Sequence, residues 1–104
     1  MSKVYVTQHI PHLNMNPALV YGEIKYFCGP GTIGSVPEKK LLAMVSTFLA
    51  PFKPVDFLVL LGDPELLAVT FSIACQISSV VQLLKYDRIQ ENYKIRKYEQ
   101  RIIP

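Results

Sequence analysis

The sequence predicts one α/β domain, residues 1–104, with a mostly parallel sheet of about five strands, two main helices and three layers. The chain is 50% hydrophobic and 18% charged, which is typical of a folded domain and not of a disordered one. An apolar run between Asp56 and Gly62 is typical of a strand buried on both faces. Helical and β-branched segments alternate along the chain, which indicates parallel strands joined by helices.

The first part of the chain is expected to form two strands joined by a helical turn. Residues 3–7 are rich in β-branched and aromatic side chains, which favours a strand. Asn16 and Pro17 form a suitable N-cap and first-turn pair, and Gly22 stands where helices often end, so residues 17–21 are predicted to form one turn. Residues 23–28 are then predicted to form a second strand, parallel to the first.

A first main helix is expected to follow a glycine-rich loop, residues 29–35. Ser35 and Glu38 have the spacing of a capping box, and Pro37 is tolerated in a first turn, so the helix is expected to begin near Val36. Pro51 should end it. The side chains predicted to form its apolar stripe are Leu41, Leu42, Val45, Phe48 and Leu49.

A central strand and a second main helix come next. Residues 57–61 form the continuous apolar run and are predicted to be the middle of the sheet. Asp63 can cap the following helix, Pro64 fits its first position, and Glu65 adds a second negative charge near the positive helix end. The helix should run to about Ile77, before two serines.

Residues 80–86 and 93–99 are predicted strands with a short link, which indicates a C-terminal antiparallel hairpin. Basic and acidic residues balance up to Leu84, so the formal charge of +3 lies entirely in the rest of the chain. The charged residues of that part are Lys85, Arg88, Lys94, Arg96, Lys97 and Arg101 against Asp87, Glu91 and Glu99.

The hairpin is predicted to carry a basic face. Alternation along the last strand places Lys94, Arg96 and Tyr98 on one side. Cations and aromatic rings of this kind can hold phosphates and stack bases, as in single-strand binders. The alternative is an edge strand whose charges discourage pairing between sheets, and the small net charge favours that interpretation. The candidate contact residues for nucleic acid or a protein partner are Lys85, Tyr86, Arg88, Lys94, Arg96 and Tyr98.

A second candidate site lies at the carboxyl edge of the parallel strands, where open α/β sheets bind ligands. The glycine-rich loop offers backbone amides for a phosphate or other small anion before a helix. It also matches the Rossmann spacing G-x-G-x-x-G, but the acid such a motif needs would fall near Asp56, which precedes a strand instead of ending one. The residues of this alternative site are His9, Gly29, Gly31, Gly34, Ser35 and Asp63.

No pattern in the sequence supports catalysis, a metal or a cofactor. His9 and His12 need further ligands to bind a metal, and Cys28 belongs to no C-x-x-C pair. No nucleophile elbow of the G-x-S-x-G type is present. Without an export signal at the N-terminus, Cys28 and Cys75 are expected to be buried thiols in a reducing cytoplasm.

Residues 66–84 contain no charge and are long enough to span a bilayer. Thr70, Gln76 and Gln82 lie inside this window, and the local pattern changes from helical to β-branched at Val80. We therefore expect a buried helix followed by a strand, and no membrane contact.

The C-terminal half resembles a set of small uncharacterised bacteriophage α/β proteins. The similarity lies in the Gly62-Asp63-Pro64 helix start, in the aromatic-Asp-Arg turn Tyr86-Asp87-Arg88 before the last strand, and in Tyr21-Gly22-Glu23 upstream. It implies a viral accessory protein and supplies no activity or functional residues.

The leading hypothesis is a non-enzymatic phage-type accessory protein that binds a partner through the basic hairpin in the host cytoplasm. Binding of a small ligand or nucleotide at the glycine-rich loop is the alternative; Gly31→Ala and Gly34→Ala should then remove the ligand and Arg96→Ala should not. A structural or assembly protein is a third class, because an edge strand can add to a partner's sheet or to a second copy of the chain.

Overall fold

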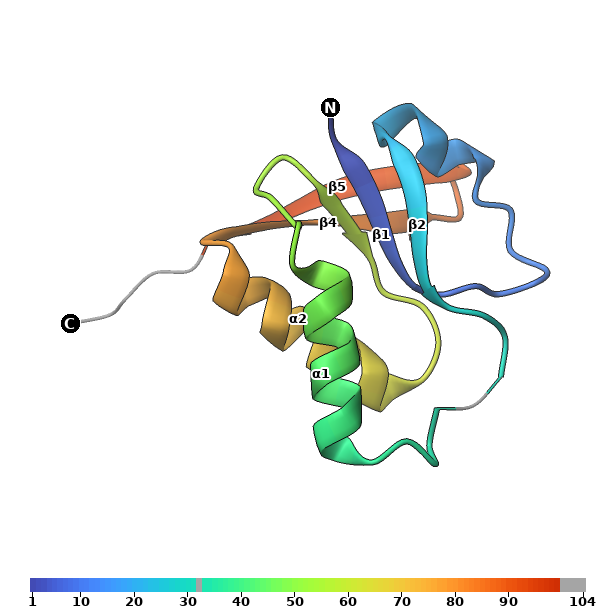
Figure 1. The fold of residues 1–104 in the computed structure, drawn as a ribbon. Coiled ribbons are helices and arrows are strands. Elements are labelled where there is room, and N and C mark those ends of the chain that lie inside the picture. The colour runs from blue at the N-terminus through green and yellow to red at the C-terminus, as the bar shows by residue number, and fades with distance from the viewer. Residues whose placement is uncertain (32, 100–104) are drawn as a thin grey trace.

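The computed structural model describes residues 1–31 and 33–99, so Thr32 of the glycine-rich loop and the basic Arg101 lie outside the described residues. Five strands form one sheet in the order β2-β1-β3-β4-β5. The strands are β1 (Lys3–Gln8), β2 (Glu23–Cys28), β3 (Phe57–Val59), β4 (Val80–Asp87) and β5 (Asn92–Glu99). The first four are parallel and β5 is antiparallel to β4, which confirms the predicted α/β class and C-terminal hairpin (Figure 1).

Both main helices pack on one face of the sheet. Helix α1 (Glu38–Leu49) and helix α2 (Pro64–Ile77) share one apolar cluster with side chains of the strands. The central members of this cluster are Tyr5, Leu41, Val45, Leu49, Leu58, Leu66, Ile73 and Val81. Leu42, predicted to be part of the apolar stripe, is 49% exposed, because a turn of about 100° from Leu41 carries it off the buried face.

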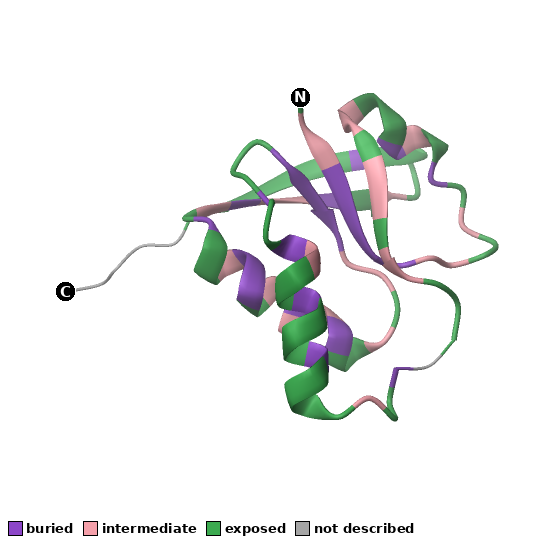
Figure 2. Cartoon of the chain, viewed as in Figure 1, coloured by how far each residue is buried: buried purple, intermediate pink, exposed green. Residues whose placement is uncertain are grey.

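The opposite face is covered by the 3-10 helix η1 (Asn16–Tyr21) and by the segment that leads into it. Met15 and Ala18 pack there against Val4, Val6 and Tyr93. Figure 2 shows the consequence: buried residues concentrate on β1 and β3, whereas β5 is exposed along most of its length. The core therefore lies under the middle of the sheet, and the hairpin lies at its margin.

The two helix starts differ from each other. Asp63 caps α2 as predicted, because its Oδ1 accepts hydrogen bonds from the amides of Glu65 (2.9 Å) and Leu66 (3.2 Å). Helix α1 begins at Glu38 instead of Val36, and no side chain caps it. The predicted capping box is wrong because Pro37, with ψ of 146°, is the N-cap residue and separates Ser35 from the first turn.

The first helical turn and the central strand also differ from the prediction. Met15, and not Asn16, is the N-cap residue of η1, and Asn16 belongs to the helix itself. The strand predicted over 57–61 ends at Val59. Leu60 and Leu61 do not continue the pairing of β3 with β4, because the backbone of Leu61 is hydrogen-bonded to Thr7 of β1.

Thr7 and Gln8 at the end of β1 determine the path of the chain after β3. The Thr7 hydroxyl donates to the carbonyl of Leu61 (2.5 Å) and accepts from the amide of Leu61 (2.6 Å). The Gln8 side-chain oxygen accepts from the amide of Asp63 (3.2 Å). Gly62 between them has a φ of +104°, and a Cβ there would lie 1.9 Å from the Gln8 oxygen. Hydrogen bonds from Thr7 and Gln8 therefore hold the β3–α2 loop against the end of β1.

Replacing Thr7 by Val should lower the free energy of unfolding by about 1–3 kcal/mol, because the side chain keeps its shape but leaves the amide of Leu61 without its partner in a partly buried position. Urea denaturation followed by circular dichroism measures the change.

Thr47→Val on the exposed surface of α1 is the matched control, since its hydroxyl also bonds to a backbone carbonyl but at an exposed position. We expect that variant to remain within about 0.5 kcal/mol of the parent. Equal effects of the two substitutions would contradict the role given to Thr7.

Candidate functional site

A cavity of about 570 Å³ opens between the end of β3 and the C-terminal hairpin. The last register pair of β3 and β4 is Leu58 with Leu83, whereas β4 continues to Asp87. Since Leu61 is bonded to β1 through Thr7, the chain after β3 moves away from β4 at this point. The cavity is the space left between the two diverging segments.

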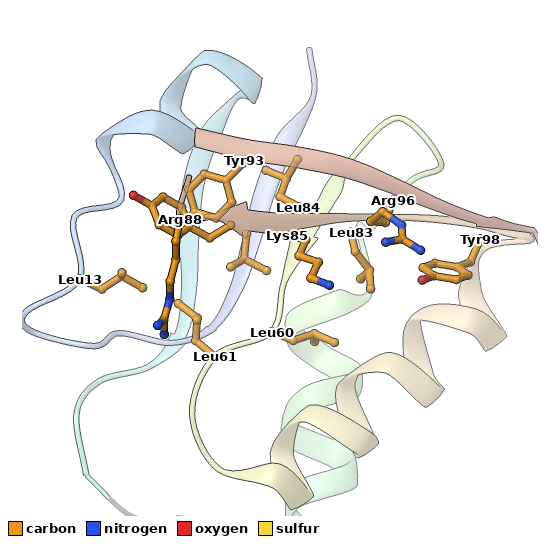
Figure 3. Close-up of a pocket in the computed structure, with 12 residues that line it drawn as sticks. Leu13, Leu60, Leu61, Leu83, Leu84, Lys85, Arg88, Tyr93, Arg96 and Tyr98 are labelled. Carbon is orange, nitrogen blue, oxygen red and sulfur yellow. The ribbon is translucent and has the colours of Figure 1, made fainter. Parts of the chain in front are cut away.

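Leucine side chains form the apolar part of the cavity wall. Leu60 and Leu61 come from the β3–α2 loop, and Leu83 and Leu84 come from β4. Figure 3 shows Lys85, Arg88 and Arg96 with their cationic ends on the side of the hairpin that faces Leu60 and Leu61. The remaining lining residues are Leu13, Val59, Tyr86, Tyr93 and Tyr98. The cavity thus combines apolar walls with cationic groups.

A second hollow of about 380 Å³ adjoins the first on the hairpin. The two share Lys85, Tyr86, Arg88 and Arg96, and the second adds Lys94, Asp87 and Ile89. All six residues predicted from the sequence as a contact surface therefore line one hollow or the other. We call this continuous surface the basic face: Lys85, Tyr86, Arg88, Lys94, Arg96 and Tyr98.

The charges of the basic face are largely uncompensated. Lys85 lies directly opposite Lys94 in the β4–β5 register, where like charges repel each other. Asp87 relieves part of this repulsion through a 2.8 Å ion pair with Lys94. Asp87 is the one acidic side chain among the described residues that line the two hollows. The charges of Lys85 and of the two arginines remain available for an anion.

Asp87 is held in its charged form by its neighbours. Its side-chain hydrogen bond with Lys94 lowers the pKa of the carboxyl first of all, and the backbone amides of Gln90 and Ile89 lower it further. The amides bond to Oδ1 at 3.2 and 2.9 Å and shape the turn between β4 and β5. One carboxylate therefore orders both the turn and the Lys94 side chain.

Two of the three tyrosines present open ring surface. Tyr86 is 38% exposed and Tyr98 is 42% exposed. Each makes an edge contact that orients it, Tyr86 with Tyr93 (5.2 Å between centroids) and Tyr98 with Phe71 of α2 (6.3 Å). A T-shaped contact covers at most one face of a ring, and a face that stays open can stack on a planar group.

Tyr93 is a lining residue that alternation along the strand assigned to the other face. It is 4% exposed, its hydroxyl donates to the Met15 sulfur (3.2 Å), and its pKa is raised chiefly by burial. Leu60 and Leu61 were not predicted to line a site. Both were predicted to belong to a buried strand, and an apolar run does not show at which residue the strand ends.

The residues of the alternative site line neither of the two hollows described above. Gln8 donates to the carbonyls of Gly31 (2.5 Å) and Gly29 (3.3 Å), so the glycine-rich loop turns these two oxygen atoms toward the end of β1. The His9 ring lies against Tyr26 (5.0 Å), and Asp63 is engaged in capping α2. Gly34 and Ser35 are exposed on the loop before α1. An anion at this site stays a prediction that the carbonyl oxygens do not favour.

The cysteines and the uncharged segment have simple structural roles. Cys28 and Cys75 are free and half-buried, less buried than expected, and burial raises the pKa of both thiols.

Within residues 1–31 and 33–99, no three His, Cys, Asp or Glu side chains are grouped to hold a metal ion. In the same part of the chain, no helix has the length and apolar character to cross a bilayer. The uncharged segment is divided between α2 and β4 at Ser78.

Comparison with known families relates the whole described domain to bacteriophages. The family model described as Phage Pam3 gp32-like protein matches residues 2–100. The chain belongs to this family. The bacteriophage relationship suggested by the short motifs of the C-terminal half is thus confirmed at the level of the family. No curated protein and no solved structure matches this phage protein.

Replacing Lys94 by Ala should raise the pKa of Asp87 toward its ordinary value, because the main cause of the lowered pKa is removed. A lowered pKa in the folded state means that the ion pair stabilises the fold above the unfolded carboxyl pKa of about 3.9, and that this stabilisation is lost as the pH falls through the folded value. NMR titration of the side-chain carboxyl carbons measures the shift.

Lys97→Ala is the matched control, because Lys97 lies on the same strand opposite Gln82 and lines neither hollow. We expect it to leave the pKa of Asp87 in place. An Asp87 titration that is the same in the parent and in Lys94→Ala would show that the ion pair does not form.

Proposed function

We propose that this phage protein acts by binding single-stranded nucleic acid with its basic face, without catalysis, in the host cytoplasm. The proposal rests mainly on one observation: Lys85, Arg88 and Arg96 border an apolar cavity, and no acidic side chain among residues 1–31 and 33–99 forms an ion pair with them. Phosphates bind to such groups through charge, and the affinity depends on the release of counterions.

Exposed tyrosines favour a single strand over a duplex. Tyr86 and Tyr98 line the same cavity as the cations. Tyr98 comes from the face of the hairpin that carries Arg96, and Tyr86 comes from the opposite face, beside Tyr93. Unpaired bases can stack on exposed rings of this kind. In a duplex the faces of the bases are already stacked on one another and are not available to these rings. A row of cations flanked by aromatic rings therefore suits a flexible strand better.

A purely protective edge strand explains the observations less well. Charges that prevent pairing between sheets are needed along the outer strand β5. Here, Lys85 belongs to β4 and Arg88 to the turn, and both face the cavity together with Arg96 of β5. The clustering of charge around a hollow supports a ligand surface.

Arg96→Ala and Lys85→Ala should each weaken binding to a labelled oligothymidine in fluorescence anisotropy, and should lower the slope of log affinity against log salt by about 0.7, the value for one phosphate contact with a single strand. The parent should lose affinity steeply as salt is raised.

Lys39→Ala and Lys40→Ala on α1 change the net charge equally but lie away from the basic face. They should leave the slope within error of the parent value. A flat salt dependence of the parent, or equal effects of all four variants, would contradict a specific nucleic-acid surface and would make a protein the better partner.

Asp87→Asn should strengthen binding by roughly two- to fivefold, which corresponds to one exposed charge pair, because Lys94 is then free to contact a phosphate. The asparagine oxygen can still accept from the amides of the turn. The same anisotropy assay measures the gain.

Glu38→Gln at the start of α1 removes the same charge at a distance and is the control. Its affinity should change less than that of Asp87→Asn. A loss of affinity in Asp87→Asn would show that Lys94 does not contribute to binding.

A further inference from the structure

We infer that the cavity between β3 and the hairpin receives one unstacked base of the bound strand, while the strand's phosphates lie along the cations of the basic face. This inference rests on the proposed function and makes it more specific. It assigns to the leucines of the cavity a role in recognition that the charges alone do not have.

The size and chemistry of the cavity suit a base. A volume of about 570 Å³ is in the range of small-molecule sites, which are mostly apolar and carry a few polar groups. Leu60, Leu61 and Leu83 provide an apolar surface for the faces of a planar ring. Figure 3 shows these leucines on the same side of the hairpin as Lys85 and Arg96, so that apolar and cationic groups border one space.

The charge of the lining residues indicates which kind of ligand the cavity can bind. A purely apolar side chain of a partner would leave Lys85, Arg88 and Arg96 beside it without compensation, and a basic peptide would be repelled. A ligand that joins an anion to a planar group with apolar faces matches both the cationic and the apolar lining. A nucleotide unit has this composition.

Continuity of the surface favours a strand over a free nucleotide. The second hollow adds Lys94 and shares four residues with the cavity, so a phosphate backbone that leaves the cavity meets further cations at once. A mononucleotide would use only part of this row. We therefore assign the base to a single strand that continues over the hairpin.

The test compares a labelled oligothymidine with an abasic oligonucleotide of equal length and charge. Contact of a base with the leucines and with the tyrosines that also line the cavity should make the parent bind the normal strand at least about fivefold more tightly. Leu60→Trp, which fills the cavity and keeps every charge, should reduce this ratio toward one by weakening the normal strand alone. Leu42→Trp on the exposed surface of α1 is the control and should keep the ratio.

The milder Leu60→Phe gives a second filling of the cavity if Leu60→Trp impairs folding, and thermal unfolding of both variants identifies that case. Equal affinity of the parent for the normal and the abasic strand would overturn the inference. So would an unchanged ratio in a folded cavity-filling variant. Thymidine monophosphate is expected to compete only weakly; displacement of the strand by equimolar monophosphate would overturn the assignment to a strand.

These outcomes separate the inference from the proposed function. If Arg96→Ala weakens both strands equally and the two strands bind alike, the basic face binds phosphates but the cavity receives no base, and only the inference fails. If Arg96→Ala weakens neither strand, the proposed function fails as well.

Discussion

The two hydrogen bonds between the Thr7 hydroxyl and the backbone of Leu61 are the constraint on which the rest of the site depends. They join the end of β1 to the loop after β3 in the way a further ladder pair would. The side chain of Gln8 extends the same connection to Asp63 and to the glycine-rich loop. Because the loop after β3 cannot follow both neighbours, attachment to β1 separates it from β4. The closed junction at β1 and the open cavity at β4 have the same cause.

The position of the cavity differs from the usual one for this kind of sheet. The chain leaves β1 toward β2 and later returns to β3, so the strand order reverses between β1 and β3, where open α/β sheets commonly bind ligands. Thr7 and Gln8 fill that position with buried polar side chains, 0% and 5% exposed. The cavity instead lies between β3 and β4, where β4 extends beyond the last residue of β3. The hairpin then supplies charge to a cavity whose walls come from the core.

The single carboxylate of Asp87 keeps the hairpin ordered and leaves most of its cations available to bind an anion. Lys85 and Lys94 lie opposite each other, and Asp87 neutralises one of them while its other oxygen holds the turn. Full compensation of the cations would leave nothing to attract an anion, and no compensation would strain the turn through repulsion. A single carboxylate keeps the hairpin ordered and leaves most of the positive charge on the side that borders the cavity.

The sequence by itself determined the elements of the fold and the chemical character of the hairpin. Apolar periodicity, the Asp63 cap and the break at Ser78 are local signals, and charge that alternates with aromatic rings is visible in any extended strand. Tertiary structure alone decided where β3 ends and that Gln8 occupies the edge expected to receive a ligand. The physical reason is the same each time. These outcomes depend on hydrogen bonds between residues more than 20 positions apart, such as the bond of Thr7 with Leu61. A local sequence pattern does not show which of two neighbouring strands a segment will bond to.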